Sequence, residues 1–111
     1  MNKLNEKIEY YPNGNVKNKS SFDENGNGIE EWFWEKGNIQ LRTPYNEGEK
    51  DGPEEYFYKN GNIKRRTPYK EGELDGIEIH WNEYGEIQQI NHYRYWKLTE
   101  SVNFDEISLS V

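Results

Sequence analysis

The sequence predicts an all-β protein in which tandem antiparallel β-hairpins line up in one elongated single sheet. Two segments of near-identical sequence, 34–45 and 58–69, are 24 residues apart, and a tandem repeat of that length is typical of one supersecondary unit stacked on the next. Hydrophobic residues make up 32% of the 111 residues and aromatic residues 15%. A shallow sheet held by aromatic side chains suits this composition better than a deep two-layer core.

Four sequence marks recur in fixed phase and divide the chain into units. They are a turn glycine, a β-branched residue two places later, a second glycine in Gly-x-Glu, and a closing aromatic residue: Gly14, Gly37, Gly61, Gly85; Val16, Ile39, Ile63, Ile87; Gly28, Gly52, Gly76; and Phe22, Tyr45, Tyr69, Tyr93. We therefore expect one domain over 1–111, with repeat units at about 10–28, 29–52, 53–76 and 77–93 and a C-terminal capping segment at 94–111.

Each complete unit contains two runs of strand length. The first runs, 29–34 and 53–58, are followed by 39–45 and 63–69, and all four are rich in aromatic and β-branched residues. The dipeptide Asn60-Gly61 between two of them is the preferred sequence for a two-residue type I′ hairpin turn. The polar stretches 46–52 and 70–76 then connect one hairpin to the next.

A two-residue turn fixes the register of each hairpin and predicts cross-strand pairs. The expected pairs are Tyr58–Ile63, Tyr56–Arg65 and Glu55–Arg66; Trp34–Ile39, Trp32–Leu41 and Glu31–Arg42; and Ile79–Ile90. Opposite charges thus face each other in two hairpins, while an apolar pair replaces them in the third. That replacement indicates that something covers this end of the sheet.

Alternation along the strands assigns the side chains to two faces. We expect the packed face to carry Trp32, Trp34, Ile39, Leu41, Tyr45, Tyr56, Tyr58, Ile63 and Tyr69. The opposite face carries the ion pairs and an aromatic row, which we expect to stack up the sheet. This row and the apolar pair form the predicted partner-binding surface: Phe33, Phe57, Trp81, Ile79 and Ile90. The alternative, that the row only stabilises stacked hairpins, stays open.

The repeat pattern ends after Tyr93. In the segment that follows, Ile107, Leu109 and Val111 alternate with polar residues, which favours a final β-strand. We expect this segment to cap the sheet and cover the Ile79/Ile90 patch. The alternative is that it pairs with the sheet edge of a second chain and produces a homodimer.

The charge balance bears on partners and location. The chain has 14 Lys and Arg residues against 21 Asp and Glu residues, a net charge of −7, which opposes nucleic-acid binding and favours a protein partner with a basic surface. The alternative is that acidity keeps a tyrosine-rich sheet soluble. The N-terminus lacks the apolar run of a signal peptide, and no stretch approaches a membrane span. We expect a cytoplasmic protein without membrane insertion.

No arrangement of residues indicates catalysis, a metal or a cofactor. Cysteine is absent, and His80 and His92 lack the spacing of a ligand pair. The acidic loops before Gly52 and Gly76 lack the ordered ligand spacing of a calcium loop, so solvated turns are the simpler interpretation. We expect a non-enzyme with no cofactor.

The recurring unit Gly-x-Glu-x-aromatic-x-aromatic-x-x-Gly-x-Ile resembles the MORN repeat (membrane occupation and recognition nexus) over about residues 10–93. It is most similar to the shorter bacterial variant found in antitoxin-like and immunity-like proteins. The resemblance implies hairpins in an elongated antiparallel sheet, and a non-catalytic module that binds and neutralises a partner protein such as a toxin. The alternative is a structural or self-associating scaffold. Acidic loops and Thr-Pro-Tyr replace the Gly-Lys-rich part of the eukaryotic pattern, so phosphoinositide binding is not expected.

Overall fold

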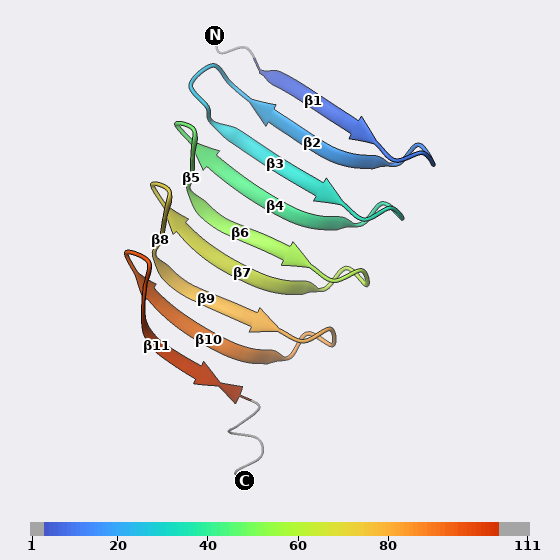
Figure 1. Ribbon diagram of the computed structural model, residues 1–111. Coiled ribbons are helices and arrows are strands. Elements are labelled where there is room, and N and C mark those ends of the chain that lie inside the picture. The colour runs from blue at the N-terminus through green and yellow to red at the C-terminus, as the bar shows by residue number, and fades with distance from the viewer. Residues whose placement is uncertain (1–3, 105–111) are drawn as a thin grey trace.

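The computed structural model describes residues 4–104 as one open antiparallel sheet of eleven strands, which confirms the predicted fold class (Figure 1). The sheet measures 55 × 35 × 17 Å. The strands are β1 (Asn5–Tyr10), β2 (Val16–Phe22), β3 (Gly28–Phe33), β4 (Ile39–Asn46), β5 (Glu49–Lys50), β6 (Gly52–Phe57), β7 (Ile63–Lys70), β8 (Glu73–Leu74), β9 (Gly76–Trp81), β10 (Ile87–Arg94) and β11 (Lys97–Asn103).

Strand order follows the chain, as expected for stacked hairpins. The path is β1-β2-β3-β4-β6-β7-β9-β10-β11, while β5 pairs with β4 and β8 pairs with β7 beside it. The hairpin tips lie along one side of the sheet and the connections between hairpins along the other (Figure 1). Each hairpin therefore contacts mainly its two neighbours, which is the arrangement of a repeat protein.

The hairpin tips differ from the predicted type I′ turn. Tyr58 N–H donates to the Asn62 carbonyl (2.8 Å) and Gly61 N–H to the Tyr58 carbonyl (3.0 Å), which makes a three-residue loop. Gly61 has φ of 95°, but Asn60 is not among the residues with positive φ. A type I′ turn needs positive φ at both central residues, so this tip is a type I turn closed by a glycine bulge.

The longer tip changes the pair nearest each turn. Ile63 lies opposite Phe57 instead of Tyr58, and an extra residue, Lys64, then restores the expected register. The predicted pairs Tyr56–Arg65 and Glu55–Arg66 are confirmed in this hairpin. The preceding and following hairpins repeat the pattern: Phe33 faces Ile39, while Trp32–Leu41, Glu31–Arg42 and Ile79–Ile90 are confirmed. The predicted pairs Tyr58–Ile63 and Trp34–Ile39 are wrong.

Two-residue turns with positive φ at both positions occur at the opposite side of the sheet. They are Glu47-Gly48 (52° and 80°), Glu71-Gly72 (50° and 83°) and Tyr95-Trp96 (49° and 72°). Asn46 pairs with Glu49, Lys70 with Glu73 and Arg94 with Lys97 across them. The turn geometry of the repeat thus continues past Tyr93, where the sequence pattern ends, although neither residue of the last turn is glycine.

Backbone hydrogen bonds join each of these turns to the preceding one. Gly72 N–H donates to the Lys50 carbonyl (2.8 Å) and Trp96 N–H to the Leu74 carbonyl (2.9 Å). At the tips, asparagine amides make a similar link: Asn15 Nδ2 donates to the Glu35 carbonyl (2.9 Å) and Asn38 Nδ2 to the Lys59 carbonyl (3.0 Å). Neighbouring hairpins are therefore fastened at both ends as well as along their strands.

Strands at the two ends of the sheet add to the predicted units. β1 pairs with β2, although we placed the first unit at residue 10. The signal was present in Lys7-Ile-Glu-Tyr-Tyr11, which precedes Gly14 as 30–34 precede Gly37. At the other end, β11 pairs with β10. The predicted strand at Ile107, Leu109 and Val111 lies outside the described residues.

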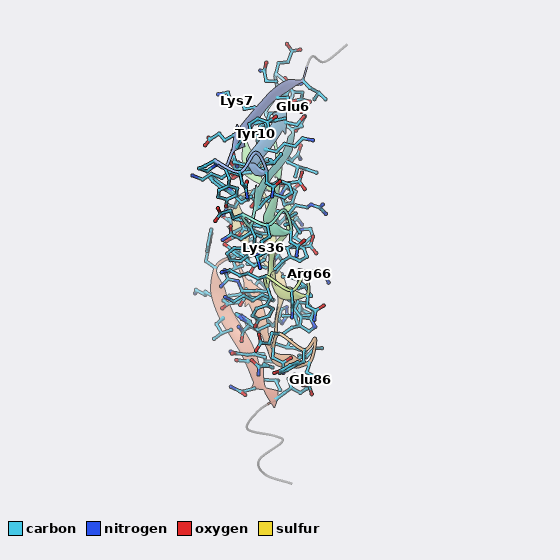
Figure 2. All side chains as sticks on the ribbon, turned by 90° about the vertical axis from the view of Figure 1, so that its right-hand side faces the viewer. Glu6, Lys7, Tyr10, Lys36, Arg66 and Glu86 are labelled. Atoms are coloured by element: carbon cyan, nitrogen blue, oxygen red, sulfur yellow. The ribbon has the colours of Figure 1, made fainter. Side chains whose placement is uncertain are left out.

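Burial is unusual on both faces of this sheet. Within residues 4–104 no hydrophobic residue is buried, whereas six polar residues are, with 3–7% of their surface exposed: Asn18, Thr43, Glu54, Thr67, Glu78 and Asn91. All six lie on one face by register, which we call the buried-polar face. In Figure 2 the sheet is seen from the hairpin tips, with Lys7 on this side and Glu6 and Arg66 on the other.

Candidate functional site

The face opposite the buried-polar face carries most of the isoleucines, and we call it the isoleucine face. Register places all five predicted partner-binding residues on it. Ile39 and Ile63, which we expected on the packed face, also lie here because they pair with Phe33 and Phe57. The isoleucine face also includes exposed apolar residues at both ends: Ile8 (37%), Ile29 (43%), Ile77 (56%), Ile87 (41%) and Val102 (39%).

The aromatic row takes one position per repeat on the isoleucine face, as predicted, but a strand separates each ring from the next. β4 lies between β3 and β6, and β7 between β6 and β9, so successive members of the row are about 9.5 Å apart. Ile39 and Ile63 fill the intervening positions. Each hairpin contributes one aromatic–isoleucine pair near its tip, Phe33–Ile39, Phe57–Ile63 and Trp81–Ile87, and we call these three pairs the apolar strip.

The centre of the isoleucine face is a row of alternating charges. Arg42 Nη2 lies 3.2 Å from Glu31 Oε2, and Arg66 Nη2 lies 3.1 Å from Glu55 Oε2, which confirms both predicted ion pairs. Arg42 and Glu55 are neighbours across β4 and β6. Exposed pairs of this kind add at most about 1 kcal/mol each, so the row mainly neutralises the centre of the face.

The charged row gives way to an apolar patch at the C-terminal end of the sheet. Ile79 follows Arg66 across β7 and β9, Ile90 faces Ile79, and Val102 faces Ile90 on β11. The Arg66 guanidinium lies 5.6 Å from the centre of the Trp81 ring, which places the last ion pair against the apolar strip. The apolar strip, the charged row and the apolar patch lie on one face of the sheet. This face is neutral in the middle and apolar at its C-terminal end.

The buried-polar face carries the residues that sequence analysis missed. Thr43 Oγ1 donates to Glu54 Oε2 (2.7 Å), and Thr67 Oγ1 donates to Glu78 Oε2 (2.8 Å). The signal was the 24-residue spacing of Glu54 and Glu78 in Gly-x-Glu and of Thr43 and Thr67 in Thr-Pro-Tyr. Buried carboxylates are tolerated when hydrogen bonds satisfy them, and here one repeat supplies the donor for the next.

A lysine from the loop closes over the first of these carboxylates. Lys50 Nζ lies 3.0 Å from Glu54 Oε2 and 4.9 Å from the centre of the Tyr69 ring. Burial is the largest single influence and would lower the pKa of Lys50. The hydrogen bond and charge attraction to Glu54, together with Tyr69 and Tyr45, outweigh burial and raise that pKa. Burial raises the pKa of Tyr45 and of Tyr69 beside it.

The second carboxylate has different partners because Leu74 stands where Lys50 stands one repeat earlier. Asn91 Nδ2 donates to Glu78 Oε1 (3.0 Å), and His80 Nε2 lies 2.8 Å from the same oxygen. Burial by itself raises the pKa of Glu78, but the hydrogen bonds from Asn91, His80 and Thr67 outweigh it and lower the pKa. His80 therefore has a structural contact with Glu78.

Within residues 4–104 the two histidines lie on opposite faces of the sheet. His92 lies opposite Ile77 and is exposed on the isoleucine face, away from His80. Over residues 4–104 no three His, Asp or Glu side chains are grouped as metal ligands would be. A hollow of about 410 Å³ at the hairpin tips is lined by Tyr11, Trp34, Glu35, Lys36, Asn38 and Lys59. Lys59 already lies over the Trp34 ring at 5.3 Å, so this hollow is partly filled by its own side chains.

Comparison with known proteins identifies a repeat family. The family model described as MORN repeat variant matches residues 3–24, 26–47 and 50–71. The first match takes in β1, and the β9–β10 hairpin continues the same geometry beyond the third match. Neither the curated proteins nor the solved structures include a match to this chain. Among the described residues, no helix has the length and apolar character needed to cross a membrane.

Proposed function

The chain belongs to the MORN repeat variant family, whose members are generally non-enzymatic modules that bind proteins or membranes, and we propose that it is a protein-binding module. Its contact surface is the isoleucine face, with Phe33, Phe57, Trp81, Ile79 and Ile90 as the central contacts. The partner is a protein that the module binds and neutralises, as an antitoxin or immunity protein does.

The observation that carries this proposal is the exposure of apolar side chains on one face. A sheet that is apolar on one face is normally stabilised by burying it against another layer. Here no hydrophobic side chain in residues 4–104 is fully buried, and Ile77 stays 56% exposed. Contiguous exposed apolar surface rimmed by polar residues is typical of a protein-interaction site.

The charge distribution supports a protein partner with a basic surface. The ion pairs neutralise the centre of the isoleucine face, so the net charge of −7 resides mainly in loops and edges around it. A neutral, partly apolar contact region with an acidic rim attracts a basic partner from a distance and then buries apolar area at contact.

Affinity capture from host lysate tests this proposal with the full chain as bait. In the variant Ile79→Glu/Ile90→Arg the apolar patch is replaced by a copy of the Glu55–Arg66 pair, which this backbone accommodates one repeat earlier. We expect wild type to recover a basic protein, and the variant to recover at least tenfold less with an unchanged circular dichroism spectrum.

The matched control exchanges charges on the other face, in Lys7→Glu/Glu9→Lys. Both residues are exposed and lie on the side of β1 opposite the isoleucine face. We therefore expect this variant to recover as much partner as wild type. Recovery of copies of this chain and nothing else would favour a self-associating scaffold. Equal recovery by the Ile79→Glu/Ile90→Arg variant would contradict the assigned surface.

The antitoxin role further requires that the recovered protein arrests growth and that co-expression of this chain relieves the arrest.

A further inference from the structure

The outer edge of β11 is a second feature that can recognise a partner, by backbone pairing. β11 pairs with β10 on its inner side, and within residues 4–104 it is the last strand of the sheet (Figure 1). The corresponding strands of earlier units, β6 and β9, have neighbours on both sides. β11 is thus equivalent to the first strand of a hairpin, and the described part of the sheet ends at this strand.

The connection to β11 repeats two features of the interior connections, the turn and its hydrogen bond to the preceding turn. The turn Tyr95-Trp96 has the same backbone geometry as Glu71-Gly72, and Trp96 N–H makes the equivalent hydrogen bond to the preceding turn (2.9 Å). The Trp96 ring lies 6.1 Å from the Tyr69 ring, edge to face. A pre-ordered edge lowers the entropic cost of adding another strand.

The two edges of the sheet differ in their protection against strand addition. β1 carries Glu6, Lys7 and Glu9 in six residues, whereas β11 carries Lys97 and Glu100 in seven. Charged side chains on an edge strand are a common way to prevent pairing with another chain. Leu98 is 54% exposed and Val102 is 39% exposed on β11. The C-terminal edge is therefore the more permissive one.

Residues on β11 indicate which strand would fit. On the inner side, Val102 faces Ile90 and Glu100 faces His92. β10 thus presents an apolar residue and, two places later, an imidazole whose N–H can donate a hydrogen bond. An antiparallel strand added on the outer side of β11 would also lie opposite Val102 and Glu100, whose side chains point to the isoleucine face. A second copy of β11 gives Glu100 no opposite charge in the two nearest face-matched antiparallel registers. One register opposes Glu100 to Glu100, where like charges are destabilising, and the register two residues along opposes Glu100 to Val102.

We propose that the edge of β11 binds an extended segment of a partner protein by antiparallel β-addition. The segment carries Ile or Val opposite Val102 and, two residues later, Lys or Arg opposite Glu100. Main-chain hydrogen bonds supply the attachment and these two positions supply the selectivity. The main-chain attachment uses the strand edge, whereas the two selectivity positions, Val102 and Glu100, lie at the border of the isoleucine face. Variants at Glu100 and at the Ile79/Ile90 patch therefore test the two contacts separately.

Amide hydrogen exchange on the full-length chain tests the proposal. The probe is the acetylated and amidated peptide Thr-Thr-Ile-Thr-Arg-Thr-Thr, compared with the same peptide carrying Glu in place of Arg. We expect the Arg peptide to slow exchange of alternate β11 amides at least tenfold at saturation, and to bind about two- to tenfold more tightly than the Glu peptide.

Charge reversal at the edge supplies the specific control. In Glu100→Lys the preference is expected to reverse in favour of the Glu peptide, whereas Glu9→Lys on β1 leaves it unchanged. Phe57→Ala, on the isoleucine face, leaves peptide binding unchanged as well. The proposal is overturned if all β11 amides are already protected in the free chain, if they remain unprotected at saturating peptide, or if Glu100→Lys keeps the original preference.

Discussion

At the scale of single residues, the sheet is organised around buried carboxylates that each repeat satisfies in its own way. Glu54 accepts from Thr43 and Tyr56 and pairs with Lys50. The residue one repeat later, Glu78, receives Thr67, Asn91 and His80 instead. The carboxylate keeps its position in each repeat, but the side chains that bind it differ. The contacts between neighbouring hairpins are therefore specific to each pair of repeats.

Removing one of these carboxylates is expected to be costly. Glu78→Ala leaves the donors of Thr67 and Asn91 without their acceptor in a buried site, and we expect the free energy of unfolding to fall by about 2–4 kcal/mol. Urea denaturation measures it. The control is Glu31→Ala, which breaks an exposed ion pair to Arg42 (46% side-chain exposure) and is expected to cost less than about 1 kcal/mol. Equal losses in the two variants would show that Glu78 is not buried as described.

The same residues predict how stability depends on pH. Folding lowers the pKa of Glu78 from 4.5, so its contribution is present above about pH 4.5 and is lost as the pH falls below that value. Folding raises the pKa of Tyr69 from 10.0 and of Lys50 from 10.5. Their contributions are present below those values and are lost as the pH rises above them.

Thermal melting across the pH range checks this dependence. We expect a plateau between about pH 4.5 and 10, with loss at both ends. In Lys50→Leu, which copies Leu74 of the next repeat, the alkaline loss is expected to be smaller. An unchanged alkaline limb in this variant would contradict the role of the Lys50–Glu54 contact.

At the scale of the hairpin, most predicted cross-strand pairs are correct although the predicted turn is not. The tip loop is one residue longer than expected, and Lys64 is an extra residue in the following strand. The two departures cancel, so Glu55–Arg66 is correct while Tyr58–Ile63 is not. A glycine after a polar residue occurs at both kinds of turn, and the dipeptide does not distinguish a type I turn with a bulge from a type I′ turn.

Gly61→Ala tests the geometry of the tip. Gly61 has φ of 95°, and a Cβ there would meet nothing within 4 Å. Backbone strain is therefore the sole cost, and we expect a loss of about 1–2 kcal/mol in the free energy of unfolding by urea denaturation. Gly61→Asn is expected to lose less, because Asn tolerates left-handed backbone. No loss in the Ala variant would mean that the tip adopts another turn.

The buried-polar row was harder to predict than the strands. Trp32, Leu41, Tyr45, Tyr56 and Tyr69 lie on the buried-polar face, as alternation predicted, whereas Ile39 and Ile63 lie on the isoleucine face. We expected aromatic and aliphatic side chains to fill the packed face. The loops between hairpins decide otherwise, because Lys50 folds over Glu54 while the rings of Tyr45 and Tyr69 flank it. Whether a polar loop folds back over a sheet depends on contacts between repeats, which strand periodicity does not encode.

At the scale of the whole molecule, the sheet reverses the usual distribution of polar and apolar residues. One face buries carboxylates, hydroxyls and amides under its own loops, while the other exposes isoleucine and aromatic side chains. The energy that orders the sheet comes from hairpins stacked on their neighbours. The apolar face is consequently left available for a partner.

Solvent accessibility of methyl groups tests this central claim most directly. Ile and Thr methyl groups of the full chain would be labelled and their NMR signals recorded with a soluble paramagnetic agent. We predict strong broadening of Ile29, Ile77 and Ile87 on the isoleucine face and little broadening of Thr43 and Thr67 on the buried-polar face. If the isoleucine methyl groups were protected as well as those of the two threonines, the free chain would already cover that face, and the account would be contradicted.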